Sequence, residues 1–166
     1  CSMRLSHFKA PFIPRERIWQ KADDFLARYW PKRELPVDIL AIAEFDLELQ
    51  FETISGLRHI ADIDALLLGD LKTIIVDRDD FLEERSQNRV RYSIAHEIGH
   101  WVLHGDIVQQ LGCNSVNDWV EAIQSMPEDQ YTWLEQHAYE FAGRVLVPRE
   151  FLVRAMDAAV ISAQKA

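Results

Sequence analysis

Hydrophobic residues recur at helical spacing in the first part of the chain. Apolar positions three and four residues apart between Pro14 and Pro31 predict a helix, with Pro14 at its first position, where proline is favoured, and Pro31 as its stop. A second, short helical pattern covers 37–45. From 46 to 53, apolar residues alternate with acidic and amide residues instead, and this spacing predicts a half-buried strand.

The middle of the chain carries a second strand signal. Gly56 indicates a turn, and the β-branched run 72–77 predicts a strand. The apolar residues of 57–68 fit either a pair of strands or a helical turn. The polar stretch 78–88 is typical of a loop.

Helical patterns return in the C-terminal half. The strongest covers 89–104 and is closed by Gly105, and another covers 131–147 and is stopped by Pro148. The order of helices, then strands, then helices predicts an α+β fold. The weaker predictions are a short helix near 117–125 within the mixed segment 106–130, a short helix over 149–160 and a frayed tail over 161–166.

Length and composition indicate one globular domain. The 166 residues are 48% hydrophobic and 27% charged, which suits one packed core and is unlike a disordered chain. No apolar run reaches the roughly 18 residues of a membrane span, residues 1–20 lack the apolar core of a signal peptide, and two cysteines exclude a disulfide scaffold or a Cys-rich zinc cluster. We therefore expect a cytoplasmic protein without a membrane segment. Cys1-Ser2, which precede Met3, are interpreted as remnants of cloning.

The net charge of −9 argues against direct nucleic-acid binding, because neutralising phosphates requires lysine and arginine. The charge is also uneven. Residues 1–35 hold 8 basic and 4 acidic side chains, 36–88 hold 4 and 13, and 89–166 hold 6 and 10. The acidic middle segment is either a solvated face or a docking surface for a basic partner.

One short motif carries recognisable chemistry, His96-Glu97-Ile98-Gly99-His100. Residues four apart lie on one face of a helix, so both imidazoles can bind one Zn²⁺, and Glu97 can act as general base on a zinc-bound water. The flanking residues are apolar, which predicts a core helix where two histidines and a glutamate need partners. We interpret the motif as a catalytic zinc site.

A catalytic zinc needs a third protein ligand, and two nearby residues fit poorly. Asp106 lies six residues after His100, but the helix break that would bring it back requires glycine where Leu103 stands. His104 lies about 12 Å along the helix axis from His96, too far to share an ion, and is expected to interact with the last carbonyls of the helix.

The favoured third ligand is Glu135, on the helix predicted over 131–147. It lies beside the apolar stripe of that helix, where the small residues Ala138 and Ala142 allow a neighbouring helix to approach. His137 is an alternative, although it is offset from Glu135 toward the polar side of the helix. Glu140 lies on a different face.

Two longer strings extend these motifs: Arg91-Tyr-Ser-Ile-Ala-His-Glu-Ile-Gly-His-Trp-Val-Leu-His104, and Glu135-x-x-Ala138-x-x-Phe141-Ala142-x-x-Leu146-x-Pro148. Together they resemble the ImmA/IrrE family of bacterial zinc metallopeptidases. Pro36-Val37 before a short helix, and a strand that ends at Asp77, agree with the same pattern. The resemblance covers roughly 36–152.

This resemblance implies a compact gluzincin-like α+β domain at 36–152, in which a small β-sheet is backed by helices and the His-Glu-x-x-His helix is central. An N-terminal helical extension at 1–35 precedes it, and a C-terminal helix end and tail at 153–166 follow. The 34 residues between His100 and Glu135 are long for this pattern, which favours an insertion at 106–130.

The resemblance also implies one zinc ion, held by His96, His100 and Glu135, with Glu97 as the base. Members of the family cleave helix-turn-helix repressors and thereby induce mobile-element transfer or stress genes. A basic repressor encoded separately is thus the expected substrate, since no helix-turn-helix is evident in this chain. One departure from the family is Tyr139, which stands where Asn or Asp usually supports the site.

The expected reaction is peptide hydrolysis, in which zinc lowers the pKa of its water toward ~7 and Glu97 deprotonates it. An edge strand, 47–53 or 72–77, would bind the extended peptide. The alternative is a zinc-containing regulatory or toxin–antitoxin-type module that binds its partner without cleaving it, although the intact Glu97 favours the enzyme. The group that stabilises the oxyanion is left open among Tyr139, Tyr92, Tyr131, Arg144 and His104.

Overall fold

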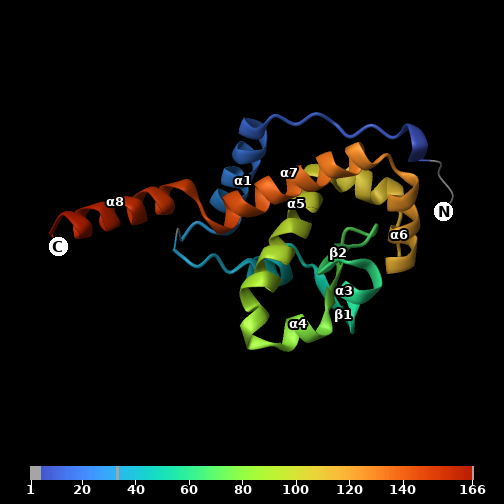
Figure 1. Ribbon diagram of the computed structural model, residues 1–166, viewed down its shortest axis with the longest axis horizontal. Coiled ribbons are helices and arrows are strands. Elements are labelled where there is room, and N and C mark those ends of the chain that lie inside the picture. Colours follow the sequence, from blue (N-terminus) through green and yellow to red (C-terminus); the bar gives the residue numbers. More distant parts are fainter. Residues whose placement is uncertain (1–4, 33, 166) are drawn as a thin grey trace.

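The computed structural model describes residues 5–32 and 34–165, so Cys1-Ser2 lie outside the described residues (Figure 1). The helices are α1 (Arg15–Tyr29), α2 (Ile39–Ala41), α3 (Leu57–Ala61), α4 (Arg78–Leu82), α5 (Gln87–Leu111), α6 (Val116–Ser125), α7 (Glu128–Leu146) and α8 (Arg149–Lys165). The strands are β1 (Gln50–Ile54), β2 (Ala65–Leu67) and β3 (Thr73–Asp77). Short 3₁₀ turns form at Leu5–His7 and Glu84–Ser86, and a π-helical turn forms at Ile42–Asp46. The predicted α+β class is confirmed.

The sheet has the order β1-β3-β2, with β1 parallel and β2 antiparallel to β3. Every residue of β3 is buried, whereas the outer strand β1 has exposed and half-buried positions. The prediction that 72–77 forms an edge is therefore wrong, because β3 pairs on both sides. The ambiguous stretch 57–68 contains both a helix, α3, and a strand, β2.

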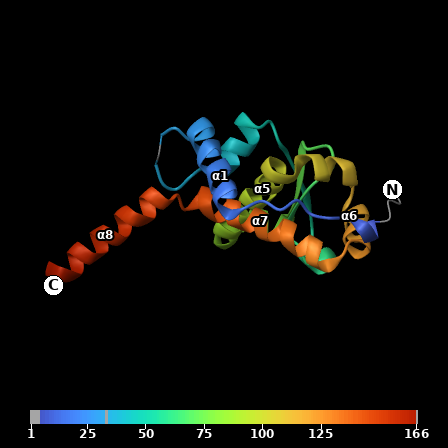
Figure 2. The ribbon, with the colours of Figure 1, turned by 90° about the horizontal axis from the view of Figure 1, so that it is seen from above.

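Helix α5 contacts β2 on one side and α7 on another, and α1 packs against α7 in turn (Figures 1 and 2). A Cβ atom added at Gly99 would lie 3.1 Å from both the Cα and the carbonyl oxygen of Ala138. The backbones of the two helices thus lie close together at Gly99 and Ala138, as the small residues of α7 predicted. Ile94, Ile98 and Phe141 are fully buried around this contact.

The polar stretch 78–88 is helical rather than a loop. Asp77 accepts hydrogen bonds from the backbone N–H groups of Asp79 and Asp80, which satisfies donors at the start of α4. Acidic residues in this first turn are also favoured by the helix dipole. Near the N-terminus, Pro14 is the cap of α1 rather than its first residue, so the helix begins one residue later than predicted, at Arg15.

Helix α5 is longer than its pattern predicted. It does not end at Gly105 but continues to Leu111 past a kink at His104, whose φ of −130° and ψ of 18° are not helical. Gly112, with a positive φ of 60°, ends the helix instead. The predicted mixed segment 106–130 is therefore mostly helical, since α6 follows almost at once.

Helix α8 projects away from the rest of the molecule (Figure 2). It continues to Lys165, so the tail predicted to be frayed is helical up to that residue, and Ala166 lies outside the described residues. The side chains from Leu152 to Gln164 are exposed. Among the residues that the structure describes, no helix combines the length and the apolar character needed to cross a membrane.

Candidate metal centre

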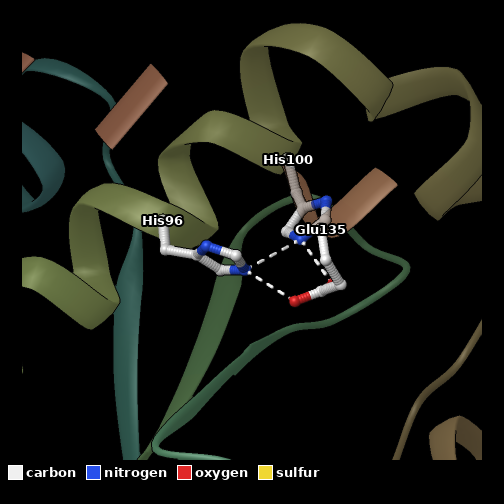
Figure 3. Close-up of side chains that lie close together, drawn as sticks. All are labelled: His96, His100 and Glu135. Atoms are coloured by element: carbon white, nitrogen blue, oxygen red, sulfur yellow. Dashed lines mark hydrogen bonds and ion pairs between the residues drawn. The ribbon is translucent and has the colours of Figure 1, made fainter. Parts of the chain in front are cut away.

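Three predicted ligands meet at one point between α5 and α7 (Figure 3). His96 and His100 lie one turn apart on α5, with 3.1 Å between their Nε2 atoms. Glu135 of α7 reaches both rings, since its Oε2 lies 3.2 Å from His96 Nε2 and its Oε1 lies 3.2 Å from His100 Nε2. The three ligand atoms lie within 4.8 Å of one another, which makes a possible metal site.

The charges of this group are mutually compensating. Burial by itself would raise the pKa of Glu135, but hydrogen bonds from His100 and His96 lower it well below its usual range. Burial would lower the pKa of His100, and the hydrogen bond and negative charge of Glu135 raise it instead. The carboxylate is thus held ionised among imidazoles, as a metal ligand must be.

Glu97 lies beside the cluster and is 7% exposed. Its Oε2 accepts a hydrogen bond of 2.7 Å from the backbone N–H of Leu67 in β2. The contact ties the predicted general base to a strand 30 residues earlier in the chain. Nothing in the motif itself indicated this partner, because hydrophobic periodicity does not reveal which backbone donors a tertiary contact leaves free.

His104 and His137 are both buried. The sequence pattern had instead placed His104 at the last carbonyls of its helix and His137 on the polar side of its own. His104 is 2% exposed and does not bond the last helix carbonyls; its Nδ1 lies 3.1 Å from Nδ1 of His100. Its Nε2 lies 3.2 Å from Nδ1 of His137, which is buried rather than on a polar face. Neither residue joins the three-ligand group. The four-residue spacing from His96 to His100 to His104 was the sequence signal that could have placed His104 on the same face of the helix as the two predicted ligands.

The environment of His104 keeps its imidazole neutral. Burial, together with the neighbouring His100 and His137, lowers the pKa of His104 to about 2. Burial and His100 also lower the pKa of His137. A row of three imidazoles therefore runs from the cluster into the contact between α5 and α7.

Two tyrosines border the cluster. The ring centroid of Tyr139 lies 4.4 Å from that of His96 and 6.2 Å from that of Tyr92, on which it stacks. Tyr131, one turn before Glu135 on α7, lines the cavity into which the cluster opens, and its pKa is raised by burial and by the charge of Glu135. The aromatic Tyr139 therefore contacts the ring of a predicted ligand from the position where Asn or Asp was expected.

Other candidates lie elsewhere. Arg144 donates two hydrogen bonds, of 2.8 and 2.7 Å, to the carboxylate of Asp23 in α1, and does not line the cavity. Glu140 accepts a hydrogen bond of 2.6 Å from the indole of Trp19, also in α1. Asp106 is exposed. The structure does not bring these three side chains to the cluster.

The cluster opens into a cavity of about 360 Å³. One wall is the segment from Asp62 to Leu67, which includes β2, and Tyr92 and Tyr139 form part of another. Beyond His104 the cavity continues between the end of α5 and helix α6, where its lining is apolar. The volume is in the range of pockets that enclose a small ligand or a large side chain.

A comparison with protein families identifies the chain. The sequence profile of the IrrE N-terminal-like domain matches residues 70–161, more than half of the chain. The chain belongs to this family. It is a family of peptidases, whose substrates are proteins, and the predicted ImmA/IrrE relationship is confirmed. No curated protein and no solved structure gives a significant match. The matched range includes α5 and α7, while the boundary between 35 and 36 stays a prediction.

Proposed function

We propose that this protein is a zinc-dependent endopeptidase that acts in the cytoplasm on one specific protein, a helix-turn-helix repressor encoded separately. The observation that carries the proposal is the convergence of His96, His100 and Glu135 beside the buried Glu97. Two imidazole nitrogens and one carboxylate oxygen are the donor set of a catalytic zinc and leave its fourth position open. A Zn²⁺ ion bound there would supply a Lewis acid that polarises a carbonyl and makes water more acidic.

Glu97 is the residue that moves the proton. Because the N–H of Leu67 holds one carboxylate oxygen at 2.7 Å, the side chain is oriented before substrate arrives. In the proposed reaction its carboxylate takes a proton from a water molecule in the cavity and delivers it to the nitrogen of the cleaved peptide bond. Loss of such a general base reduces rates by about 10²–10⁴-fold.

Strand β2 is the edge that suits an extended substrate. The N–H of Leu68 and the carbonyl of Asp64 bond to residues 73 and 77, on the β3 side. Ala65 and Leu67 therefore direct their backbone groups toward the opposite edge, which faces the cavity. The N–H of Leu67 on this edge is bonded to Glu97, so the backbone groups offered to a peptide are those of Ala65 and the carbonyl of Leu67. A peptide can add there by main-chain hydrogen bonds next to the cluster, so β2 replaces the edges expected at 47–53 and 72–77.

Surface charge supports a basic partner. Four acidic side chains on the π-helical turn and around β1 are exposed, and Asp62 is exposed at the cavity wall. DNA-binding repressors are basic because they neutralise phosphates, so this surface would accelerate their association. The four residues are Glu44, Asp46, Glu48 and Glu52.

The decisive experiment incubates the zinc-loaded protein with the product of a neighbouring helix-turn-helix repressor gene and detects a discrete cut by mass spectrometry. The matched control is Glu97→Gln, which keeps the size of the side chain and removes the base. We expect cleavage by the wild type alone. If zinc-loaded Glu97→Gln still relieves repression fully, the protein acts by binding, as the alternative hypothesis holds. Purified protein without zinc, and unchanged by His96→Ala, would overturn the metal site.

A further inference from the structure

The cavity beside the cluster has two chemically different ends. At the cluster it is lined by charged and polar groups, including Glu97, Glu135 and Asp64. At the far end the described lining residues carry no charge. This apolar end is formed by residues of α5, α6 and their surroundings, Ile107, Val108, Leu111, Cys113, Trp119, Ile123, Met126 and Leu134.

The far end belongs to a segment that is firmly attached to the fold. The N–H of Gly69, just after β2, donates a hydrogen bond of 2.8 Å to the carbonyl of Cys113. A Cβ atom at Gly69 would lie only 2.8 Å from the Cα of Gly112, so the two loops touch backbone to backbone. Ser115 caps α6 by accepting from the N–H of Asp118. The pocket wall is therefore preformed.

Ile123 is the residue of α6 that best indicates what this part of the cavity binds. Other apolar residues on α6, such as Val116 and Trp119, pack into hydrophobic clusters, but Ile123 belongs to none of the clusters formed by the described residues. It is half-buried and lines the cavity instead. An apolar side chain that faces a cavity without core partners gains contacts only when something apolar fills that cavity.

We propose that the apolar end of the cavity is a substrate pocket for one large apolar side chain, aliphatic or aromatic, next to the peptide bond that is cleaved. The cavity is continuous, so a peptide whose carbonyl lies at His96, His100 and Glu135 has an adjacent side chain within reach of α6. A charged side chain would be desolvated there without a partner and is excluded. The segment 112–126 thus sets cleavage specificity. This inference rests on the proposed peptidase function.

The first test is cleavage of a peptide library by the zinc-loaded protein, with the cut sites read by mass spectrometry. We expect Leu, Ile, Met or Phe to be enriched at one position beside the cut. Ile123→Trp fills the pocket and should shift that position to small residues, with at least about a tenfold loss of kcat/KM for large ones. Ile123→Ala enlarges the pocket and should admit Trp. Glu121→Trp, on the exposed side of α6, is the matched control and should change nothing.

A second measurement does not depend on turnover. Hydroxamates bind zinc directly, so leucine hydroxamate and glycine hydroxamate compare a large side chain with none at a fixed anchor. Burial of the leucine side chain predicts about ten- to a hundredfold tighter binding by calorimetry. Ile123→Trp should abolish this ratio, while thermal unfolding confirms that the variant folds.

The outcomes separate the two proposals. Glu97-dependent cuts without apolar enrichment, or equal binding of the two hydroxamates, overturn the pocket and leave the peptidase intact. A wild-type protein that makes no Glu97-dependent cut, either in the repressor or in any library peptide, overturns the proposed function, and with it the role of the pocket in cleavage. A specificity unchanged in both Ile123 variants also overturns the pocket.

Discussion

Substitution of His104 tests whether the buried row of imidazoles supports the metal site. A Zn²⁺ ion held by Nε2 of His100 would leave that ring neutral, with its proton on Nδ1, and in the described structure only His104 Nδ1, 3.1 Å away, is within reach as an acceptor. His104 must then carry its own proton on Nε2 and donate it to Nδ1 of His137 at 3.2 Å. The proton position on His100 thus determines the tautomer of His104, and that tautomer makes Nδ1 of His137 an acceptor.

His104→Leu removes the hydrogen bonds to His100 and His137 from a residue that is 2% exposed. Each buried partner left unsatisfied costs about 1–3 kcal/mol. The loss of a hydrogen-bond partner behind a metal-ligating histidine weakens metal binding by about 10–100-fold. We therefore expect His104→Leu to bind zinc about 10–100-fold more weakly and to unfold at a lower urea concentration. His104→Gln retains an acceptor and a donor and should recover much of the zinc affinity.

The assay is competition for zinc against a chelator of known affinity, together with urea unfolding of the metal-free protein. His59→Leu is the matched control, because His59 is exposed on α3 and far from the row in the sequence. If His104→Leu binds zinc as tightly as the wild type, the reasoning is refuted. If His104→Leu and His104→Gln lose the same affinity, the effect is one of packing and not of hydrogen bonding.

Three further predictions concern the same core. In the metal-free protein, His104 should lower the free energy of unfolding by up to about 1.4 kcal/mol per pH unit once the pH is well below 6.5, because with a pKa of about 2 it stays neutral while the unfolded chain is protonated. His137, whose pKa is also lowered, acts in the same direction. A free energy of unfolding, measured in urea, that stays constant down to pH 4.5 would contradict this. Glu135→Gln should lose zinc on dialysis yet remain folded, as measured by metal analysis and circular dichroism, and retained zinc would count against Glu135 as a ligand. Gly99→Ala should destabilise the fold by about 1–3 kcal/mol, because its Cβ would press on Ala138; an unchanged urea midpoint would show that α5 and α7 adjust freely.

Local sequence pattern was sufficient to select the three candidate ligands that the structure brings together, and to predict the main helices. The i, i+4 spacing puts His96 and His100 on one face of any helix, whatever surrounds it. Glu135 was selected as the third ligand because it lies beside the apolar stripe of its own helix. The α+β class was predicted from the order of helical and strand patterns along the chain. These inferences needed no long-range information, because helical geometry relates residues that are close in the chain.

Tertiary contacts decided the features that the sequence pattern predicted wrongly, namely the burial of two histidines and the order of the strands. His104 was assigned to the last carbonyls of its helix and His137 to the polar side of its own, yet both are buried because α5 and α7 pack together and pair their imidazoles. The edge beside the cluster is β2 rather than β3, since strand order depends on pairings between distant segments.

The sequence by itself thus determined which residues could bind a metal, because ligand spacing is a property of one helix. The structure alone decided what surrounds them: the N–H of Leu67 on the base, the imidazole row behind His100, and the apolar pocket at Ile123. Each arises where elements separated in the chain meet, and burial and hydrogen bonding at such contacts depend on all the partners at once.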